Sequence, residues 1–313
     1  MNALLHQAVF RGLHLVVMAK FDIEKWCSHV QNYRITYSYV VPPVLLLLSK
    51  HPVVDKYDLS SLRMMNSGAA PLTRELVDAV YARLKVGVKQ GYGLSETSPI
   101  THAQPWAEWN DSVGSVGKLV PNMEAKYTVM SEDGTEEARE VAMGEVGELS
   151  VRGDNIFQGY HNNEAATRDC LSPDGWFRTG DVGYQDAKGN FFITDRVKEL
   201  IKYKGFQVAP AELEGILVDN PAVDDVAVVG MESKEQSTEV PVAFIVRSEK
   251  SKASGVSDEQ EATNIIQWLD GKVAHHKRLR GGVRFIDAVP KSVAGKILRR
   301  LLKKQLEAPK AKL

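Results

Sequence analysis

The segment Leu62–Tyr92 has the sequence LRMMNSGAAPLTRELVDAVYARLKVGVKQGY and gives the clearest signal of the fold. Its first residues form an apolar run that predicts a strand, and the apolar spacing over Thr73–Leu84 predicts a helix after the turn Ser67–Pro71. A second strand is predicted at Val86–Gln90. Strands that alternate with helices indicate a parallel sheet with helices on its faces. Ligands bind such sheets beyond the carboxyl ends of the strands, which makes Ser67–Pro71 and Gly91–Glu96 candidate ligand-binding loops.

The sequence before this segment predicts a similar alternation. Asp22 is a candidate N-cap for a helix, and a strand is predicted at Ile35–Val41 and a helix at Pro43–Lys50. Residues 1–9 have helical spacing, and the apolar run Leu13–Met18 predicts a buried strand.

The pattern changes after Ser112. Short strands separated by turn signals continue to Arg196 and predict an antiparallel sheet or a small barrel. A mixed pattern of helices and strands follows, with helices predicted at Ala211–Val218 and Ile297–Leu306. Two strands are predicted between these helices, at 225–229 and 242–246.

Composition excludes several classes of protein. The 313 residues suggest about two domains. The 39 Lys and Arg residues balance 40 Asp and Glu residues, and this net charge of −1 argues against general nucleic-acid binding, which needs a basic surplus. Two cysteines, Cys27 and Cys170, cannot form a disulfide framework and favour a reducing compartment. No apolar run is long enough to span a membrane.

Four motifs contain residues that suit nucleotide chemistry. In Gly91-Tyr92-Gly93-Leu94-Ser95-Glu96 the glycines admit a ligand, Tyr92 could stack on a base and Glu96 could bind Mg²⁺. Asp181 follows Thr179-Gly180 and could accept hydrogen bonds from a ribose diol. Taken alone, the first motif is more typical of a tight turn with an exposed carboxylate, and Asp181 is more typical of a β-turn.

The other two motifs are rich in basic residues. The stretch 195–202 (DRVKELIK) places charges around a short apolar alternation, a pattern that is also typical of a solvated strand face. Lys296 lies on a glycine-flanked loop that enters a helix, where it could bridge anionic oxygens. The following Arg299, Arg300, Lys303 and Lys304 are expected to form a solvated helix face.

In combination the motifs carry a resemblance to a known family. The segments 91–96 (GYGLSE), 179–181 (TGD), 195–205 (DRVKELIKYKG) and 295–299 (GKILR) resemble, in order and spacing, those of acyl-adenylate-forming enzymes, the AMP-dependent synthetase/ligase superfamily. The stretch 205–214 (GFQVAPAELE) looks most like the 4-coumarate–CoA ligase branch, which is related to luciferases. The resemblance covers essentially the whole chain.

The resemblance implies a fold class and a division into domains. The fold class is α/β and α+β: the C-terminal part of a large multi-layer α/β domain with a small β subdomain, followed by a small mobile α+β domain. The domains would be residues 1–196, from the AMP-binding (adenylation) domain, and residues 197–313, the C-terminal domain of AMP-binding enzymes.

It also implies a two-step ligase that uses ATP, Mg²⁺ and coenzyme A. An aryl or fatty carboxylic acid would attack the α-phosphate of ATP to give an acyl-adenylate, and the thiol of coenzyme A would then displace AMP. A luciferase-like oxygenase shares the adenylation motifs and is the less favoured alternative, since nothing in the sequence suggests a flavin or metal centre.

Site residues carry over at the matching positions of this chain. Lys296 would stabilise charge during adenylation, Glu96 would hold Mg²⁺, and Lys198 would be the hinge. The implied nucleotide-binding residues are Ser67, Gly68, Ala69, Ala70, Gln90, Gly91, Tyr92, Gly93, Ser95, Asp181, Arg196, Lys202 and Gln207.

Two departures from the family pattern stand out. Ser95 replaces the more usual Thr and keeps the hydroxyl. The Ser/Thr/Gly-rich phosphate loop does not occur in these 313 residues, so an N-terminally truncated enzyme with weak or no activity is expected. The alternative is a non-catalytic remnant that binds a nucleotide or coenzyme A.

The last three residues, Ala311-Lys312-Leu313, resemble the Ser-Lys-Leu peroxisomal address. They predict a peroxisomal import receptor as a partner and the peroxisome as the location, with the cytoplasm as the alternative.

Overall fold

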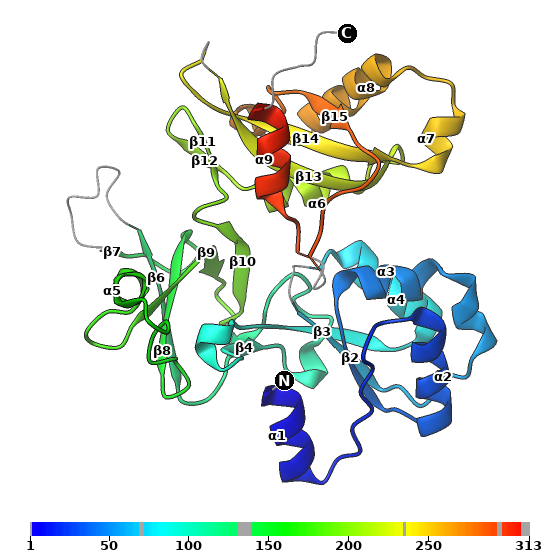
Figure 1. Ribbon diagram of the computed structural model, residues 1–313, viewed down its shortest axis with the longest axis vertical. Helices are drawn as coiled ribbons and strands as arrows, with labels where there is room; N and C mark the ends of the chain where they lie inside the picture. The colour runs from blue at the N-terminus through cyan, green and yellow to red at the C-terminus, as the bar shows by residue number, and fades with distance from the viewer. Residues whose placement is uncertain (1, 69–71, 130–138, 234–235, 293–295, 308–313) are drawn as a thin grey trace. The chain divides into compact units, whose positions relative to one another are not determined.

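The computed structural model describes residues 2–68, 72–129, 139–233, 236–292 and 296–307 (Figure 1). The chain forms two compact units, unit 1 over Met1–Ile193 and unit 2 over Thr194–Leu313, and each is described by itself. Unit 1 contains an α/β layer and an antiparallel sheet, and unit 2 is α+β.

The segment Leu62–Tyr92 forms the predicted strand–helix–strand unit of a five-stranded sheet with strand order β1-β2-β3-β4-β5. Strands β1 to β3 are parallel, and β4 and β5 add antiparallel. The strands are β1 (Tyr37–Val40), β2 (Met64–Ser67), β3 (Gly87–Tyr92), β4 (His102–Ala103) and β5 (Lys118–Leu119).

Helices pack on one face of this sheet over a core that includes Leu45, Leu48, Met65, Val77 and Val80. Their start signals are local: a side-chain oxygen of the residue before the helix accepts from a backbone N–H of the first turn in α2 and α4. The helices and short 3₁₀ turns of this part are α1 (Asn2–Arg11), α2 (Ile23–Tyr33), α3 (Pro42–Lys50), η1 (Pro52–Lys56), α4 (Arg74–Leu84), η2 (Ser95–Thr97) and η3 (Trp106–Glu108).

The second sheet of unit 1 has the order β10-β9-β8-β6-β7. Strand β6 pairs antiparallel with β7 and β8, and β8 pairs antiparallel with β9, as the turn signals predict. Its core centres on Tyr127, Leu149, Phe177 and Phe191, against which Tyr92 of β3 also packs. The elements are β6 (Met123–Val129), β7 (Arg139–Glu140), β8 (Gly147–Gly153), α5 (Glu164–Cys170), β9 (Phe177–Gln185) and β10 (Phe191–Arg196).

Unit 2 is built around a long antiparallel hairpin, β13–β14, with β15 parallel to β14. Leu213, Leu217, Ile245, Ile265 and Leu269 are fully buried in its core. The elements are β11 (Ile201–Tyr203), β12 (Phe206–Val208), α6 (Pro210–Leu217), β13 (Val223–Ser233), β14 (Thr238–Arg247), α7 (Glu249–Ala253), α8 (Asp258–Asp270), η4 (His275–Lys277), β15 (Val283–Phe285) and α9 (Arg299–Glu307).

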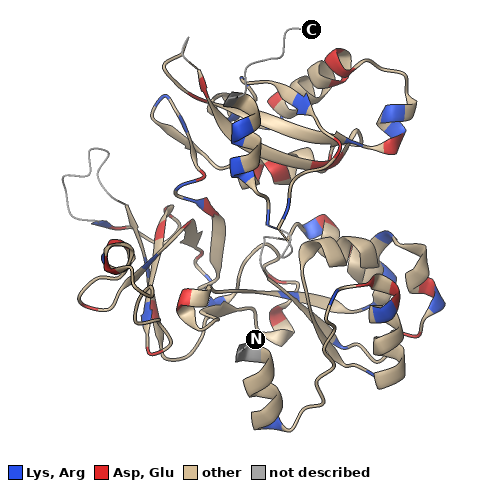
Figure 2. Ribbon diagram, in the orientation of Figure 1, with Lys and Arg blue, Asp and Glu red and all other residues tan. Residues whose placement is uncertain are grey.

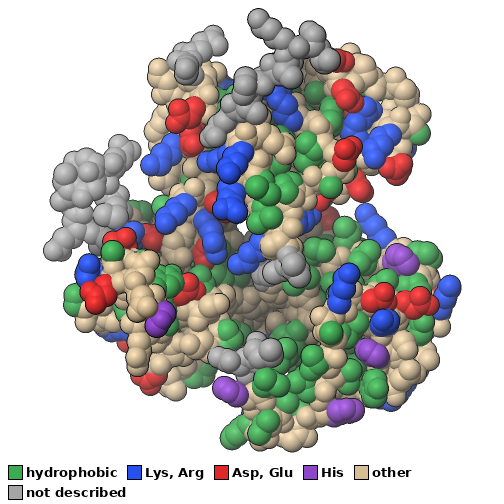
Figure 3. All heavy atoms as spheres, viewed as in Figure 1, with side chains coloured by type: hydrophobic (Ala, Val, Ile, Leu, Met, Phe, Trp, Pro, Cys, Tyr) green, Lys and Arg blue, Asp and Glu red, His purple; other side chains and the backbone are tan. Residues whose placement is uncertain are grey.

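One predicted strand is wrong. Residues 13–18 have no regular secondary structure, and Leu13 and Val17 are 58% and 73% exposed. A strand needs a neighbour for its backbone hydrogen bonds, and no described strand pairs with this segment. Val9 and Phe10 of α1 are also exposed, at 84% each. Figure 3 shows hydrophobic side chains on the surface in the region of α1.

None of the helices in the described parts of the chain combines the length and the apolar character that crossing a bilayer requires.

Candidate functional site

The carboxyl ends of β2 and β3 form the floor of the candidate site in unit 1. Ser67 and Gln90 lie in register on these neighbouring strands, and both are buried. Gln90 is held from both sides: its Oε1 accepts from the Leu72 N–H at 3.1 Å, and its N–H donates to Oε1 of Gln104 at 2.7 Å. A polar floor therefore lies at the edge where parallel sheets bind ligands.

Of two glycines beside this floor, one has no room for a side chain. A Cβ on Gly68 would make an ordinary contact with the carbonyl oxygen of Gly91 at 3.7 Å, whereas a Cβ on Gly93 would collide with the backbone of Pro99. The fold therefore requires glycine at position 93. The predicted site residues Ala69 and Ala70 lie outside the described residues.

The two sheets of unit 1 meet at Tyr92 and Asp181. The Tyr92 hydroxyl donates a short hydrogen bond to Oδ2 of Asp181, which is buried on β9. The backbone N–H of Asp181 also donates to Oγ1 of Thr179 at 3.1 Å. Because 89 residues separate Tyr92 from Asp181 in the sequence, only the packed fold brings an aromatic ring and a buried carboxylate together at the end of β3.

Glu96 is oriented by a residue that the sequence did not single out. Ser95 and Glu96 open the short turn η2, where Ser95 is exposed and Glu96 is half-buried. The Tyr160 hydroxyl donates to Oε1 of Glu96 at 2.9 Å, and the Phe157 N–H donates to the Glu96 carbonyl at 2.8 Å. Burial, reinforced by this carboxylate, raises the pKa of Tyr160 to about 12, so the phenol keeps the proton that it donates.

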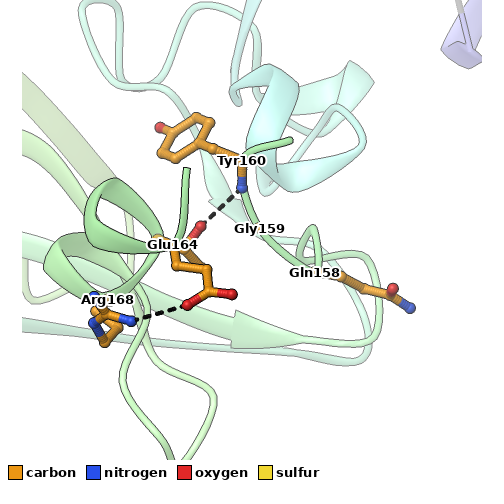
Figure 4. A pocket seen from close by; sticks show the side chains of 6 residues that line it. Gln158, Gly159, Tyr160, Glu164 and Arg168 are labelled. Carbon is orange, nitrogen blue, oxygen red and sulfur yellow. Dashed lines mark hydrogen bonds and ion pairs between the residues drawn. The ribbon is translucent and has the colours of Figure 1, made fainter. Parts of the chain in front are cut away.

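A pocket of about 400 Å³ lies beside this pair (Figure 4). At its rim, Arg168 and Glu164 form an exposed ion pair at 3.3 Å, and the Tyr160 N–H donates to Oγ1 of Thr167 at 2.9 Å. The lining residues are Gln158, Gly159, Tyr160, Glu164, Thr167 and Arg168. The pocket therefore shares Tyr160 with Glu96, and the polar Gln158–Asn163 turn after β8 was the signal that could have indicated it.

His102 packs beside Tyr92 of the site and was not identified from the sequence. It lies opposite Tyr92 on β4, fully buried, with its ring 4.3 Å from the Phe191 ring and 5.8 Å from the Tyr92 ring. Its Nδ1 lies 2.8 Å from Oγ1 of Thr101. Burial lowers the pKa of His102 to about 3, so the ring stays neutral and acts as an apolar support.

Unit 2 holds the other predicted site residues. Lys202 and Gln207 lie opposite each other in the hairpin β11–β12, and both are exposed. Arg196 and Lys198 are exposed at and just after the end of β10. Lys296 is exposed, and its N–H donates to Oγ of Ser292 at 3.2 Å.

These positions divide the predicted residues into two groups. Ser67, Gln90, Tyr92 and Asp181 converge in unit 1, with Glu96 on the loop that follows β3. Lys202 and Gln207 form a pair in unit 2. The arrangement in unit 1 offers an aromatic face, a buried acceptor and an oriented carboxylate, which suit a base, a sugar hydroxyl and a cation.

Comparison with known proteins agrees with this chemistry. The AMP-binding enzyme family matches residues 2–161, and the AMP-binding enzyme C-terminal domain matches residues 212–296. The chain is 43% identical to "Probable 4-coumarate--CoA ligase 2" of Dictyostelium discoideum, over 94% of this chain and 51% of that protein. It is 40% identical to "Luciferin 4-monooxygenase" of Luciola mingrelica, over 96% of this chain and 53% of that protein.

Solved structures agree as well. The crystal structure of ATP-bound MatB from Rhodopseudomonas palustris matches with a TM-score of 0.83 and 27% identity, over 96% of this chain and 56% of that one. The chain spans about half the length of the curated relatives that it matches. The chain belongs to the AMP-binding enzyme family, because that family matches residues 2–161 and its C-terminal domain matches residues 212–296.

Proposed function

We propose that the chain carries the nucleotide-binding and catalytic groups of an acid–CoA ligase similar to 4-coumarate–CoA ligases. In the first step, a carboxylate oxygen bonds to the α-phosphorus of ATP and pyrophosphate leaves. In the second step, the sulfur of coenzyme A bonds to the acyl carbon, its proton passes to solvent, and AMP leaves. The observation that carries the proposal is the Tyr92–Asp181 pair at the end of β3, in a chain of the AMP-binding enzyme family.

The adenosine part of the nucleotide would bind over the floor of unit 1. Tyr92 would present its ring to adenine, and Ser67, Gly68 and Gln90 would line the same space, together with Ala69 and Ala70. Gly91 and Gly93 would let the nucleotide approach the backbone. Asp181 would accept hydrogen bonds from the ribose hydroxyls, and Arg196 would donate to them.

Glu96 fits a magnesium site of the kind that uses one carboxylate together with substrate phosphates. Its Oε1 is oriented by Tyr160, and its Oε2 accepts no hydrogen bond from the described residues. When bound, Mg²⁺ would neutralise charge on the phosphates of ATP. The exposed hydroxyl of Ser95 would donate to a phosphate oxygen beside it.

The residues of unit 2 would act in turn through a change in domain orientation. Lys296 would stabilise the negative charge that develops on the carboxylate and α-phosphate oxygens during adenylation. Lys202 and Gln207 would face the adenylate in one of the two orientations. Lys198 would be the hinge, and Lys198→Pro should slow thioester formation because proline restricts the backbone rotation that a hinge needs.

The test separates the two half-reactions. In an enzyme restored to full length, Lys296→Ala should lower acid-dependent ATP–pyrophosphate exchange by roughly 10²–10³-fold, and thioester formation from a preformed acyl-adenylate should fall far less. Lys304→Ala, on the exposed face of α9, is the matched control. Equal losses in both half-reactions would refute the role of Lys296. Binding of AMP by the full-length enzyme without exchange or thioester formation would favour the non-catalytic alternative.

We also propose the peroxisome as the location, through binding of an import receptor to Ala311-Lys312-Leu313. These three residues lie outside the described part of the chain. A fluorescent protein fused to the N-terminus should enter peroxisomes, and deletion of Leu313 should return it to the cytoplasm. The same distribution with and without Leu313 would refute this proposal.

A further inference from the structure

Arg299, at the start of α9, departs from the solvated helix face that the sequence predicts. Its side chain is only 14% exposed, whereas the neighbouring Arg300 and the later Lys304 are exposed as expected. Figure 2 shows the Lys and Arg positions along α9. Because a charged side chain is seldom buried unless it is paired, the surroundings of Arg299 identify what it does.

The guanidinium of Arg299 connects three separate parts of unit 2. Its Nη2 donates to both carboxylate oxygens of Glu214 on α6, at 2.8 and 2.7 Å. Its Nη1 donates to Oε2 of Glu199 at 2.7 Å, and its Nε donates to the Val228 carbonyl on β13 at 3.3 Å. Charge-assisted and bidentate bonds of this kind hold both position and orientation.

Glu199 brings the proposed hinge into this network. It directly follows Lys198 in a turn where the N–H groups of Glu199 and Leu200 donate to the Arg196 carbonyl, at 2.9 and 3.0 Å. Glu199 is the side chain through which this turn reaches Arg299. The hydrogen bond from Arg299 to Glu199 therefore connects the turn around Lys198 to the first residue of α9.

Lys296 lies in the segment just before the start of α9. It precedes Arg299 by three residues, and the Ser292 N–H donates to the Lys296 carbonyl at 2.8 Å. The Leu298 N–H donates to the Pro290 carbonyl at 2.8 Å, next to Lys291, whose Nζ pairs with Asp225 on β13 at 2.6 Å. With the chain fixed at Leu298, a displacement of Arg299 would also displace Lys296.

We propose that Arg299 is a positioning residue that holds Lys296 and the turn around Lys198 in one fixed arrangement within unit 2. This inference rests on the roles proposed above for Lys296 and Lys198. Arg299 touches no reacting atom: it acts through Glu199 on the turn and through the base of α9 on Lys296. Lysine cannot replace it, because an ammonium lacks the planar fork that serves two carboxylates and a carbonyl together.

The first test measures the two half-reactions in three variants of the enzyme restored to full length. Arg299→Lys should lower kcat of both half-reactions by about 10–100-fold with the KM for ATP unchanged, because misplacement by about 1 Å costs on this order. Glu199→Ala should lower mainly thioester formation, because it frees the turn and leaves the Glu214 pair intact. Arg300→Ala, one residue further along α9, should match the unaltered protein. Unchanged kcat in Arg299→Lys and Glu199→Ala, with or without a lower unfolding temperature, would overturn the inference.

The second test does not depend on activity. In protein labelled with ¹⁵N-leucine, Arg299→Lys should speed hydrogen exchange at the amides of both Leu200 and Leu298, with Leu149 of unit 1 as the unaffected reference. Faster exchange at Leu200 alone would show that the turn and the Lys296 segment are not coupled, and would overturn the inference. A full-length enzyme without pyrophosphate exchange or thioester formation would refute the proposed function, and the amide exchange would still decide the coupling.

Discussion

Acid should destabilise unit 1 through His102. Its ring is fully buried between the rings of Tyr92 and Phe191, and burial lowers its pKa from the usual 6.5 to about 3. The folded state therefore keeps the ring neutral where the unfolded chain takes up a proton. Since the unfolded state binds more protons, the free energy of unfolding should fall as the pH falls from about 6.5 towards 3.

The size of the effect follows from these two pKa values. At pH 5 the unfolded His102 is almost fully protonated and the folded one is almost fully neutral. Linkage then gives a loss of about 2 kcal/mol at pH 5 relative to pH 7 from this side chain alone. His102→Gln, which cannot titrate, should remove that part of the pH dependence, whatever its effect on stability at pH 7.

Urea unfolding at pH 7 and pH 5 measures this difference. Trp268 of unit 2 is replaced by Phe, so that fluorescence reports on the other four of the five tryptophans, all in unit 1. His161→Gln, at an exposed position, is the matched control and should keep the loss between the two pH values. If His102→Gln loses as much stability on acidification as the His161→Gln control, the buried neutral histidine is not the cause and the reasoning is refuted.

Three further changes test other parts of the structure. Gly93→Ala should abolish AMP binding measured by calorimetry, because its Cβ would collide with the Pro99 backbone, and unaltered affinity would contradict this. Burial raises the pKa of Glu214 to about 7, so its contribution to unfolding free energy should fall as pH rises from about 4.5 to 7. Glu214→Gln should reduce the change of the unfolding free energy with pH, when unfolding of unit 2 is followed by Trp268 fluorescence. An unchanged dependence on pH would contradict this expectation. Arg83→Ala should cost about 2 kcal/mol in urea unfolding at pH 7, because the Leu48 and His51 carbonyls lose the hydrogen bonds that Arg83 donates. The exposed Arg34→Ala should change the unfolding free energy little, and equal effects of the two variants would contradict this.

Local signals predicted most of the elements correctly. Asp22 accepts from the Lys25 N–H at the start of α2, and Thr73 accepts from the Leu76 N–H at the start of α4. The strand–helix–strand unit at Leu62–Tyr92 is confirmed as β2, α4 and β3. These features were predictable because a cap, a turn and an apolar period are each set by residues within a few positions of one another.

Contacts between residues far apart in the sequence were predicted wrongly in two ways: one expected pairing is absent from the described residues, and one observed pairing was not expected. The segment 13–18 is apolar enough for a strand, yet no described strand pairs with it. Arg299 has the sequence environment of a surface residue, yet it pairs with Glu199 across 100 residues of sequence. Neither outcome is encoded in the neighbouring residues.

The family, the α/β layer and the residue types that suit a nucleotide can all be read from the sequence, because motifs and apolar periods are set by neighbouring residues. The side-chain pairs could not be read in this way: Tyr92 with Asp181, Glu96 with Tyr160, and Arg299 with Glu199 and Glu214. A buried or oriented polar group needs a partner. Here that partner is 64 to 100 residues away, and only packing of the core brings it within hydrogen-bonding distance.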